Sequence, residues 1–179
     1  ALGAEPADTD EFLVSDAGVL KRMDYSHIKG GTTAPYFCAG RSADQSSLSD
    51  STWTKFEGTN EILDSDGEYD NATNYRFTPQ TSGNYYVSLG ISFGSGDNQD
   101  LQQTKIAIYK NGSAIIQQIY DPAQQGTAYI HPQHLSGMVA LNGTSDYIEA
   151  YVWIDTTSGT RHIDHDTGSN HFSAFKMTE

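Results

Sequence analysis

The stretch RFTPQTSGNYYVSLGIS, residues 76 to 92, decides how this chain folds. After Gly83 the residues alternate strictly between two sets. One set is apolar and comprises Tyr85, Val87, Leu89, Ile91 and Phe93, and the other comprises Tyr86, Ser88, Gly90, Ser92 and Gly94. Because successive side chains of a strand point to opposite faces, this alternation predicts a strand with one buried face. Pro79 and the cluster Thr81-Ser82-Gly83 predict a tight turn just before it.

Short strands separated by turns continue along the rest of the chain. Ile106 and Ile108 lead into Asn111-Gly112, a dipeptide typical of two-residue hairpins. The run Leu135 to Leu141 ends at Asn142-Gly143-Thr144, where we predict a second hairpin. The following run alternates again, with Ile148, Ala150, Val152 and Ile154 on one side and Tyr147, Glu149, Tyr151 and Trp153 on the other. No amphipathic helix separates these segments, so we predict an all-β fold, a β-sandwich or jelly roll.

The charge of the chain excludes several classes of partner. Among 179 residues, 10 Lys and Arg face 23 Asp and Glu, for a net charge of −13. Such a field repels nucleic acid and anionic membrane surfaces, so we expect no nucleic-acid partner. The opening ALGAEPADTD lacks the segments of a signal peptide, and no stretch is long and apolar enough for membrane insertion. Cys38 is the only cysteine, which rules out an intrachain disulfide and a thiolate metal cluster.

Residues 1–31 differ from residues 32–179 and are interpreted as a separate attachment segment. A polar leader is followed by a short strand over Phe12 to Val14, a turn at Ala17-Gly18 and a second short element at Val19-Leu20. Asp24 is a candidate cap of a helical turn over Tyr25 to Lys29. A segment this small cannot bury a core alone, so we expect it to dock on another protein.

Several motifs resemble those of the C1q-like domains. Phe77, five further residues and then Gly83-Asn84-Tyr85-Tyr86-Val87 match the pattern F-x5-G-x-Y-x-[FV] of that family. Four more motifs occur in the family's order, namely Glu68-Tyr69-Asp70, Ile108-Tyr109-Lys110-Asn111-Gly112, Asp146-Tyr147-Ile148 and Phe172-Ser173-Ala174-Phe175. The resemblance implies a jelly roll of the C1q/TNF type that assembles as a compact homotrimer. The outward aromatic residues Tyr147, Tyr151 and Trp153 are then candidates for the trimer interface, unless loops cover them.

The leader DEFLVSDAGVLKRMDYSHIKGG is similar to the short connecting segments of tailed-phage structural proteins. This resemblance implies a virion surface protein, extracellular after release by lysis, that joins another virion structural protein through residues 1–31. Its function would be adhesion, as the tip of a fibre, spike or knob that binds a host surface glycan or protein. Two alternatives stay open: a capsid decoration or head-fibre protein, and a secreted C1q/TNF-like ligand. No collagen-like repeat precedes the domain, which argues against the complement-type members.

Three long polar loops, 95–104, 121–133 and 155–171, are the predicted ligand contacts, because loops on a rigid scaffold carry recognition. The candidate ligand-binding residues are Tyr129, His131, Arg161, His162, His165 and His171.

Two acidic stretches are candidate metal sites. DSDGEYDN, residues 64 to 71, resembles part of a calcium loop, and some C1q-like trimers hold calcium. RHIDHDTGSNH, residues 161 to 171, combines imidazoles and carboxylates. The alternative for each is an acidic or polar loop exposed to solvent, and no cofactor is required. The candidate ligands are Asp64, Asp66, Glu68, Asp70, Asp164 and Asp166.

GISFG, residues 90 to 94, matches the G-x-S-x-G pattern of serine hydrolases. That motif requires a strand, a sharp turn and a helix, whereas Ser92 lies inside an alternating strand. No nucleophile triad, acid–base pair or phosphate-binding loop has a credible context elsewhere. We therefore predict a protein that is not an enzyme.

Overall fold

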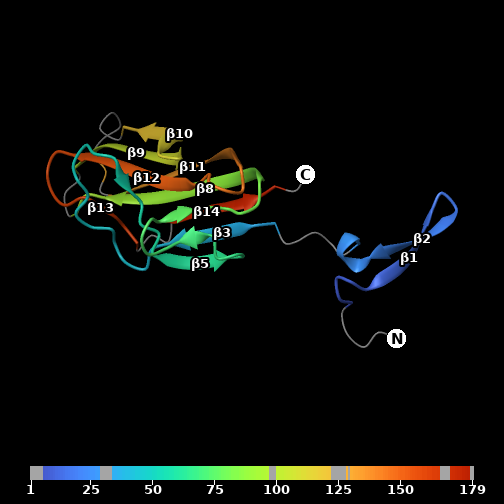
Figure 1. Cartoon of the computed structure of the whole chain (residues 1–179). Helices are drawn as coiled ribbons and strands as arrows, with labels where there is room; N and C mark the ends of the chain where they lie inside the picture. The colour runs from blue at the N-terminus through green and yellow to red at the C-terminus, as the bar shows by residue number, and fades with distance from the viewer. Residues whose placement is uncertain are drawn as a thin grey trace. The chain divides into compact units, whose positions relative to one another are not determined.

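The computed structural model describes residues 6–28, 34–96, 100–121, 128, 130–165 and 170–177. The chain divides into two compact units, Ala1–Thr33 and Ala34–Glu179, and each is described by itself (Figure 1). Among the described residues no helix has the length and apolar character to cross a bilayer.

The N-terminal unit is a β-hairpin followed by one turn of 3₁₀-helix. β1 (Glu11–Asp16) pairs with β2 (Val19–Asp24) in antiparallel register, and η1 (Tyr25–His27) follows. Ala17 and Gly18 form the turn with φ of 50° and 85°, as the sequence predicts. Asp24 precedes η1, but its side chain makes no capping hydrogen bond. The capping role predicted for Asp24 is therefore wrong.

The second unit is a sandwich of two antiparallel sheets (Figure 1). The first sheet has the order β10 (Ser113–Tyr120), β9 (Leu101–Lys110), β12 (Ile148–Thr156), β7 (Arg76–Phe77) and β6 (Tyr69–Asp70), with β4 (Thr54–Lys55) also pairing with β12. The second has the order β11 (Ile130–Leu141), β8 (Gly83–Gly94), β14 (His171–Lys176), β3 (Tyr36–Gly40) and β5 (Asn60–Asp64), with β13 (His162–Ile163) also pairing with β8.

β8 is the strand predicted from the opening stretch, and it lies between β11 and β14. Tyr85, Val87, Leu89, Ile91 and Phe93 are all fully buried, which confirms the predicted core face. The far half of β8 is also buried on its other face, where the His162 side chain of β13 lies against Gly94. The backbone N–H of Ser92 donates to Asn170 Oδ1 at 2.7 Å, and the N–H of Asp164 donates to the Ser92 carbonyl at 2.9 Å. Ser92 is thus an interior strand residue.

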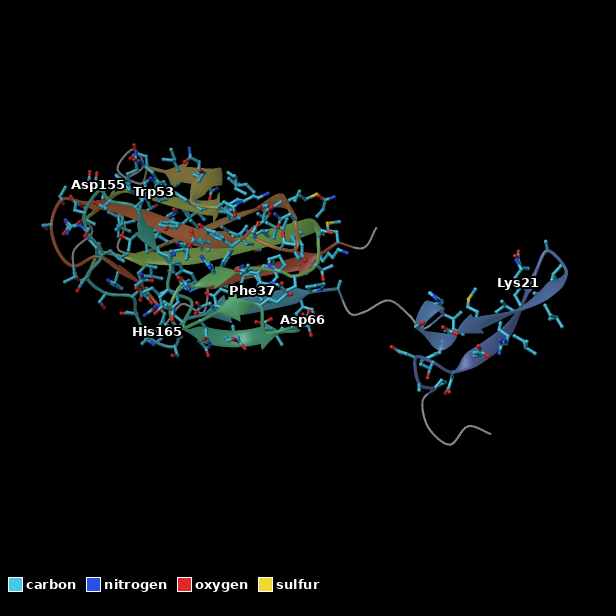
Figure 2. All side chains as sticks on the ribbon, in the orientation of Figure 1. Lys21, Phe37, Trp53, Asp66, Asp155 and His165 are labelled. Atoms are coloured by element: carbon cyan, nitrogen blue, oxygen red, sulfur yellow. The ribbon has the colours of Figure 1, made fainter. Side chains whose placement is uncertain are left out.

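Between the sheets, Phe37 organises a cluster of aromatic rings (Figure 2). Its ring centre lies 4.8 Å from that of Tyr69, 4.5 Å from Phe77 and 4.9 Å from Phe172. These four rings come from β3, β6, β7 and β14, so they join the two sheets. Aromatic packing of this kind contributes beyond the burial of apolar area.

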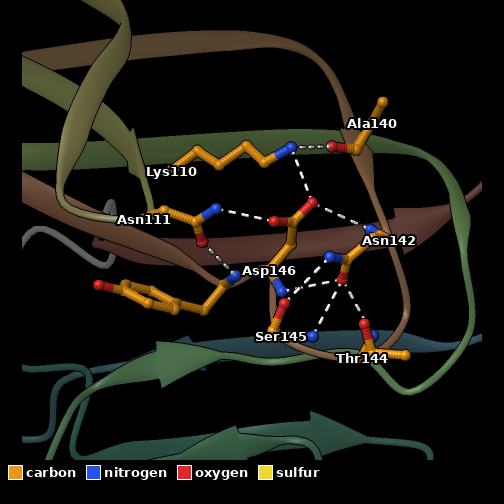
Figure 3. A network of polar contacts seen from close by, with 8 residues as sticks. Lys110, Asn111, Ala140, Asn142, Thr144, Ser145 and Asp146 are labelled. Atoms are coloured by element: carbon orange, nitrogen blue, oxygen red, sulfur yellow. Dashed lines mark hydrogen bonds and ion pairs between the residues drawn. The ribbon is translucent and has the colours of Figure 1, made fainter.

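A polar network fixes the two turns at one end of the sandwich (Figure 3). Asn111 and Gly112, with φ of 51° and 79°, connect β9 to β10, which confirms the predicted hairpin. Asn111 Nδ2 donates to Asp146 at 2.7 Å, and Lys110 forms an ion pair with Asp146 at 2.8 Å. These two donors lower the pKa of the Asp146 carboxyl. Asn142 Oδ1 accepts hydrogen bonds from the backbone N–H groups of residues 144 to 146.

The second hairpin predicted from the sequence is wrong. The turn at Asn142-Gly143-Thr144 joins β11 of one sheet to β12 of the other, so it crosses between layers. The turn itself is where the sequence predicts it, since Gly143 has a φ of 70°. A turn signal reports only the local backbone, however, whereas the partner of each strand is chosen by long-range pairing.

Candidate functional site

A hollow in the jelly-roll unit lies where residues 44–48 run beside residues 159–162. It has a volume of about 400 Å³ and is lined by Asp44, Ser46, Leu48, Thr160, Arg161 and His162, among others. Backbone hydrogen bonds position its walls: the N–H of Gln45 donates to the Ile163 carbonyl, and that of Leu48 to the Arg161 carbonyl, both at 3.2 Å. We call this hollow the loop pocket.

Charged groups around the loop pocket are already paired. Arg161 Nε donates to Asp50 at 2.8 Å. The backbone N–H of His165 donates to Asp44 at 2.9 Å, and its Nδ1 lies 2.8 Å from the same oxygen. The hydrogen bonds from His165 lower the pKa of the Asp44 carboxyl. Since these charges compensate one another, the pocket offers hydrogen-bonding groups for a polar ligand more than a net charge.

The predicted ligand-binding residues do not form one site. Arg161 and His162 line the loop pocket, and His165 is joined to it through Asp44. His131 lies on β11, half-buried, with its ring 3.8 Å from that of Tyr120 on β10 and nearly parallel to it. Burial lowers the pKa of the His131 imidazole. The fifth, His171, lies on the outward face of the second sheet, and Tyr129 is outside the described residues.

His171 belongs to a small cluster that sequence reasoning missed. Ser88 Oγ lies 3.0 Å from His171 Nε2 and 2.9 Å from His134 Nε2, and the two imidazole rings are 5.5 Å apart. Both histidines are paired with Gly90 of β8, one from each neighbouring strand. The alternation of β11 gives the outward orientation of His134, but only the strand order brings it near His171.

In the acidic turn, residues 64 to 71, carboxylates accept hydrogen bonds from nearby backbone N–H groups. Asp64 accepts hydrogen bonds from the backbone N–H groups of Asp66, Gly67 and Tyr69 at 2.8 to 3.3 Å. Asp70 accepts from the N–H groups of residues 72 to 74, and these bonds lower its pKa to about 2. Glu68 accepts from the N–H of Gln80 at 2.7 Å, while burial raises its pKa.

The predicted metal sites therefore gain no support from the geometry. Within the described ranges no three His, Cys, Asp or Glu side chains gather as a metal site. Asp164 lies beside β8, where its N–H binds the Ser92 carbonyl, and Asp166 is outside the described residues. Calcium binding stays a prediction.

The outward face of the second sheet carries an exposed apolar row. Phe175 of β14 is paired with Tyr36 of β3 on one side and with Tyr86 of β8 on the other, and Tyr86 is paired with Met138 of β11. Phe175 is 49% exposed, Met138 60% and Tyr36 38%, and the rings of Tyr86 and Phe175 are 5.4 Å apart. These four residues, from four adjacent strands, are the apolar row.

Tyr147, Tyr151 and Trp153 lie on the opposite sheet, facing outward from β12 or its start, and all three are half-buried. Basic side chains rest on their rings: Arg76 lies 4.5 Å from the ring centre of Tyr147, and Lys105 lies 3.7 Å from that of Trp153. The sequence predicted their outward direction correctly. It did not reveal these cations, which come from other strands.

Comparison with known proteins identifies the architecture. No protein-family model matches the chain. No curated protein matches it either. Among solved structures, the crystal structure of murine APRIL at pH 5.0 is similar with a TM-score of 0.57 and 8% identity, over 80% of this chain and 99% of that one. The Eiger TNF structure from S. frugiperda is similar with a TM-score of 0.55 and 10% identity, over 82% of this chain and 93% of that one. The fold is a C1q/TNF-like jelly roll. At such low identity the likeness shows the fold alone, and it confirms the predicted all-β jelly roll.

Proposed function

We propose that the protein is a non-enzymatic, trimeric virion surface protein, the tip of a phage fibre, spike or knob, that binds a host surface. The observation that carries the proposal is the apolar row of Tyr36, Phe175, Tyr86 and Met138 on a C1q/TNF-like jelly roll. An uncharged row that crosses four strands and stays exposed in a single chain is typical of a surface that associates. In this proposal, another copy of the chain covers the apolar row.

The apolar row suits a self-association surface better than Tyr147, Tyr151 and Trp153 do. Three of its four members, Tyr36, Phe175 and Met138, are exposed, and its pairs leave no charge within it. By contrast, Arg76 and Lys105 lie directly over the aromatic residues of β12, and burying them would remove two charges from water. Interface cores are depleted of charged residues, so we assign the trimer contact to the second sheet.

The N-terminal hairpin supports attachment to a second virion protein. Leu13 and Leu20 lie on one face of the hairpin and are 72% and 71% exposed. A single two-stranded hairpin is at best marginally stable in water, because it buries little of its own apolar surface. A partner that covers these leucines would stabilise the hairpin, in line with a connector formed by residues 1–31.

The loop pocket is the proposed contact with the host surface. It combines Arg161, His162 and Leu48 on loops held by β13 and β8, so its backbone is rigid while its side chains reach solvent. Each copy needs only weak affinity, since three linked copies bind with avidity.

Light scattering tests the assembly, and binding to cells tests the adhesion. We expect three times the 19.5 kDa mass of one chain, with and without a strong chelator. A stable monomer would refute the trimer, and a trimer that dissociates only in chelator would make calcium structural. We also expect fluorescently labelled protein to bind intact cells of a susceptible host, and Arg161→Ala to weaken that binding. A trimer that binds no host cell, and whose loss weakens the particle, would favour a capsid decoration protein.

A further inference from the structure

The outward face of the first sheet combines aromatic rings with cations. We call this the aromatic face and define it by Trp53, Tyr109, Tyr147, Tyr151 and Trp153. The rings of Tyr109 and Tyr151 are 4.2 Å apart, and Trp53 meets Tyr109 edge-on at 6.1 Å. These rings come from β9, β12 and the segments just before β4 and β12, so the sheet fixes their spacing.

Basic and acidic side chains both lie on this face: Arg76 is paired with Glu149 of β12 on one side and with Asp70 of β6 on the other. Lys55, Arg76 and Lys105 all point outward here, as their pairing with Tyr151, Glu149 and Trp153 shows. Lys55 is neutralised by an ion pair with the buried Glu149. Neither Arg76 nor Lys105 makes an ion pair with any described residue. Among the described residues, two cations therefore remain outside any ion pair, each beside an aromatic ring.

A ligand that fits this face needs an apolar surface for the rings and an anion for the two cations. Planar carboxylates are the groups that Arg and Lys bind with charge-assisted hydrogen bonds. Acidic sugars supply both features, because the C–H face of a pyranose ring packs on aromatic side chains and the carboxylate projects from its edge. A single-stranded nucleic acid could also stack here. Its dense phosphate charge is disfavoured by a protein of net charge −13 whose described residues offer two cations outside ion pairs at the site.

We propose that the aromatic face binds an acidic carbohydrate, with Arg76 and Lys105 holding its carboxylates and the Tyr and Trp rings holding its sugar faces. The inference goes beyond the host contact proposed at the loop pocket, because it adds a separate ligand site on the first sheet. It uses the sheet opposite the apolar row, so trimer formation and sugar binding are separable.

Tryptophan fluorescence tests the proposal directly, because both tryptophans of the chain, Trp53 and Trp153, lie on the aromatic face. The full chain is titrated into the millimolar range with trigalacturonate, with its methyl ester as a matched uncharged sugar, and with an oligothymidylate. We expect saturable quenching by trigalacturonate that weakens with added salt, and little by the ester. Equal quenching by both sugars, quenching by neither, or tighter binding of the oligothymidylate would overturn the proposal.

Charge variants make the test specific. Arg76→Gln and Lys105→Gln should each weaken trigalacturonate binding about tenfold, the value of one charge-assisted hydrogen bond. Lys176→Gln, on β14 of the other sheet, should leave it unchanged. Unchanged binding in both aromatic-face variants would overturn the assignment. Light scattering on the same samples separates the two proposals. A monomer whose fluorescence the sugar quenches would refute only the trimer. A trimer whose fluorescence the sugar does not quench would refute only the sugar site.

Discussion

Replacing Phe175 with serine is the most direct way to test what the apolar row does. Phe175 lies at the centre of the row, between Tyr36 and Tyr86, and is 49% exposed. An aromatic side chain presents roughly 200 Å² of surface, so about 100 Å² of Phe175 is available to a neighbouring copy. At about 25 cal/mol per Å², covering it contributes about 2.5 kcal/mol per copy.

Three copies multiply this effect in a trimer. Losing about 7 kcal/mol raises the overall dissociation constant by about five powers of ten. Because that constant has units of concentration squared, the midpoint concentration of dissociation rises about 300-fold. Light scattering over a dilution series should therefore show Phe175→Ser falling to monomer at concentrations where the natural sequence is trimeric.

Ile119→Ser is the matched control. The exposed fraction of Ile119, 54%, is similar to that of Phe175, but Ile119 lies on β10 of the other sheet. Both changes remove a half-exposed apolar side chain from a strand, so their costs to the fold should be similar. A trimer that Phe175→Ser leaves intact would refute the assignment of the interface. If Tyr151→Ser dissociated it instead, the interface would lie on β12, as the sequence predicted.

Three further predictions concern the fold. Gly143→Ala should destabilise the protein by about 3 kcal/mol in chemical denaturation, because a Cβ there would lie 2.2 Å from the Ser82 nitrogen. Gly67→Ala is its control, since Gly67 has a φ of 69°, like the 70° of Gly143, but a Cβ there would meet nothing within 4 Å. This control should cost only about 1 kcal/mol. Asp70→Asn should be less stable than the natural sequence at pH 7, but this difference should vanish as the pH falls from about 4 through 2. The Asp70 pKa is lowered from 3.8 to about 2, so its charge stabilises only above that window. His131→Phe should gain stability relative to the natural sequence as the pH falls below 6.5, since burial lowers the His131 pKa and the unfolded chain takes up the proton first.

The elements could be predicted where one face of a strand is buried. The core face of β8, the inward residues of β12 and the hairpin at Asn111-Gly112 all follow from period-2 alternation and turn chemistry. Ile62 and Leu63 show the limit of that reasoning, since both are apolar neighbours on β5 and both are 54% exposed. Their place at the edge of the second sheet is a property of strand order, which no local pattern contains.

The candidate sites could be predicted only as lists of residues. Arg161 and His162 meet Asp44 across more than a hundred residues because β13 pairs with β8 and residue 45 bridges to residue 163. His134 and His171 meet because their strands flank β8. Pairing of this kind depends on which strands share a sheet, so composition and spacing alone cannot supply it.

The two outer faces of the sandwich explain why one sequence pattern admits two functions. Alternation predicts outward aromatic side chains on both strands, Tyr151 and Trp153 on β12 and Phe175 on β14, and cannot separate an interface from a ligand site. The difference comes from the neighbouring strands: β9 and β7 place Lys105 and Arg76 on the aromatic face, whereas β8 and β11 place Tyr86 and Met138 in the apolar row. A buried interface can accept Tyr86 and Met138 without desolvating a charge, while a water-exposed ligand site can use Lys105 and Arg76. High salt should therefore weaken binding of an acidic sugar and leave the trimer intact, since screening acts on exposed charges and hardly on apolar contacts.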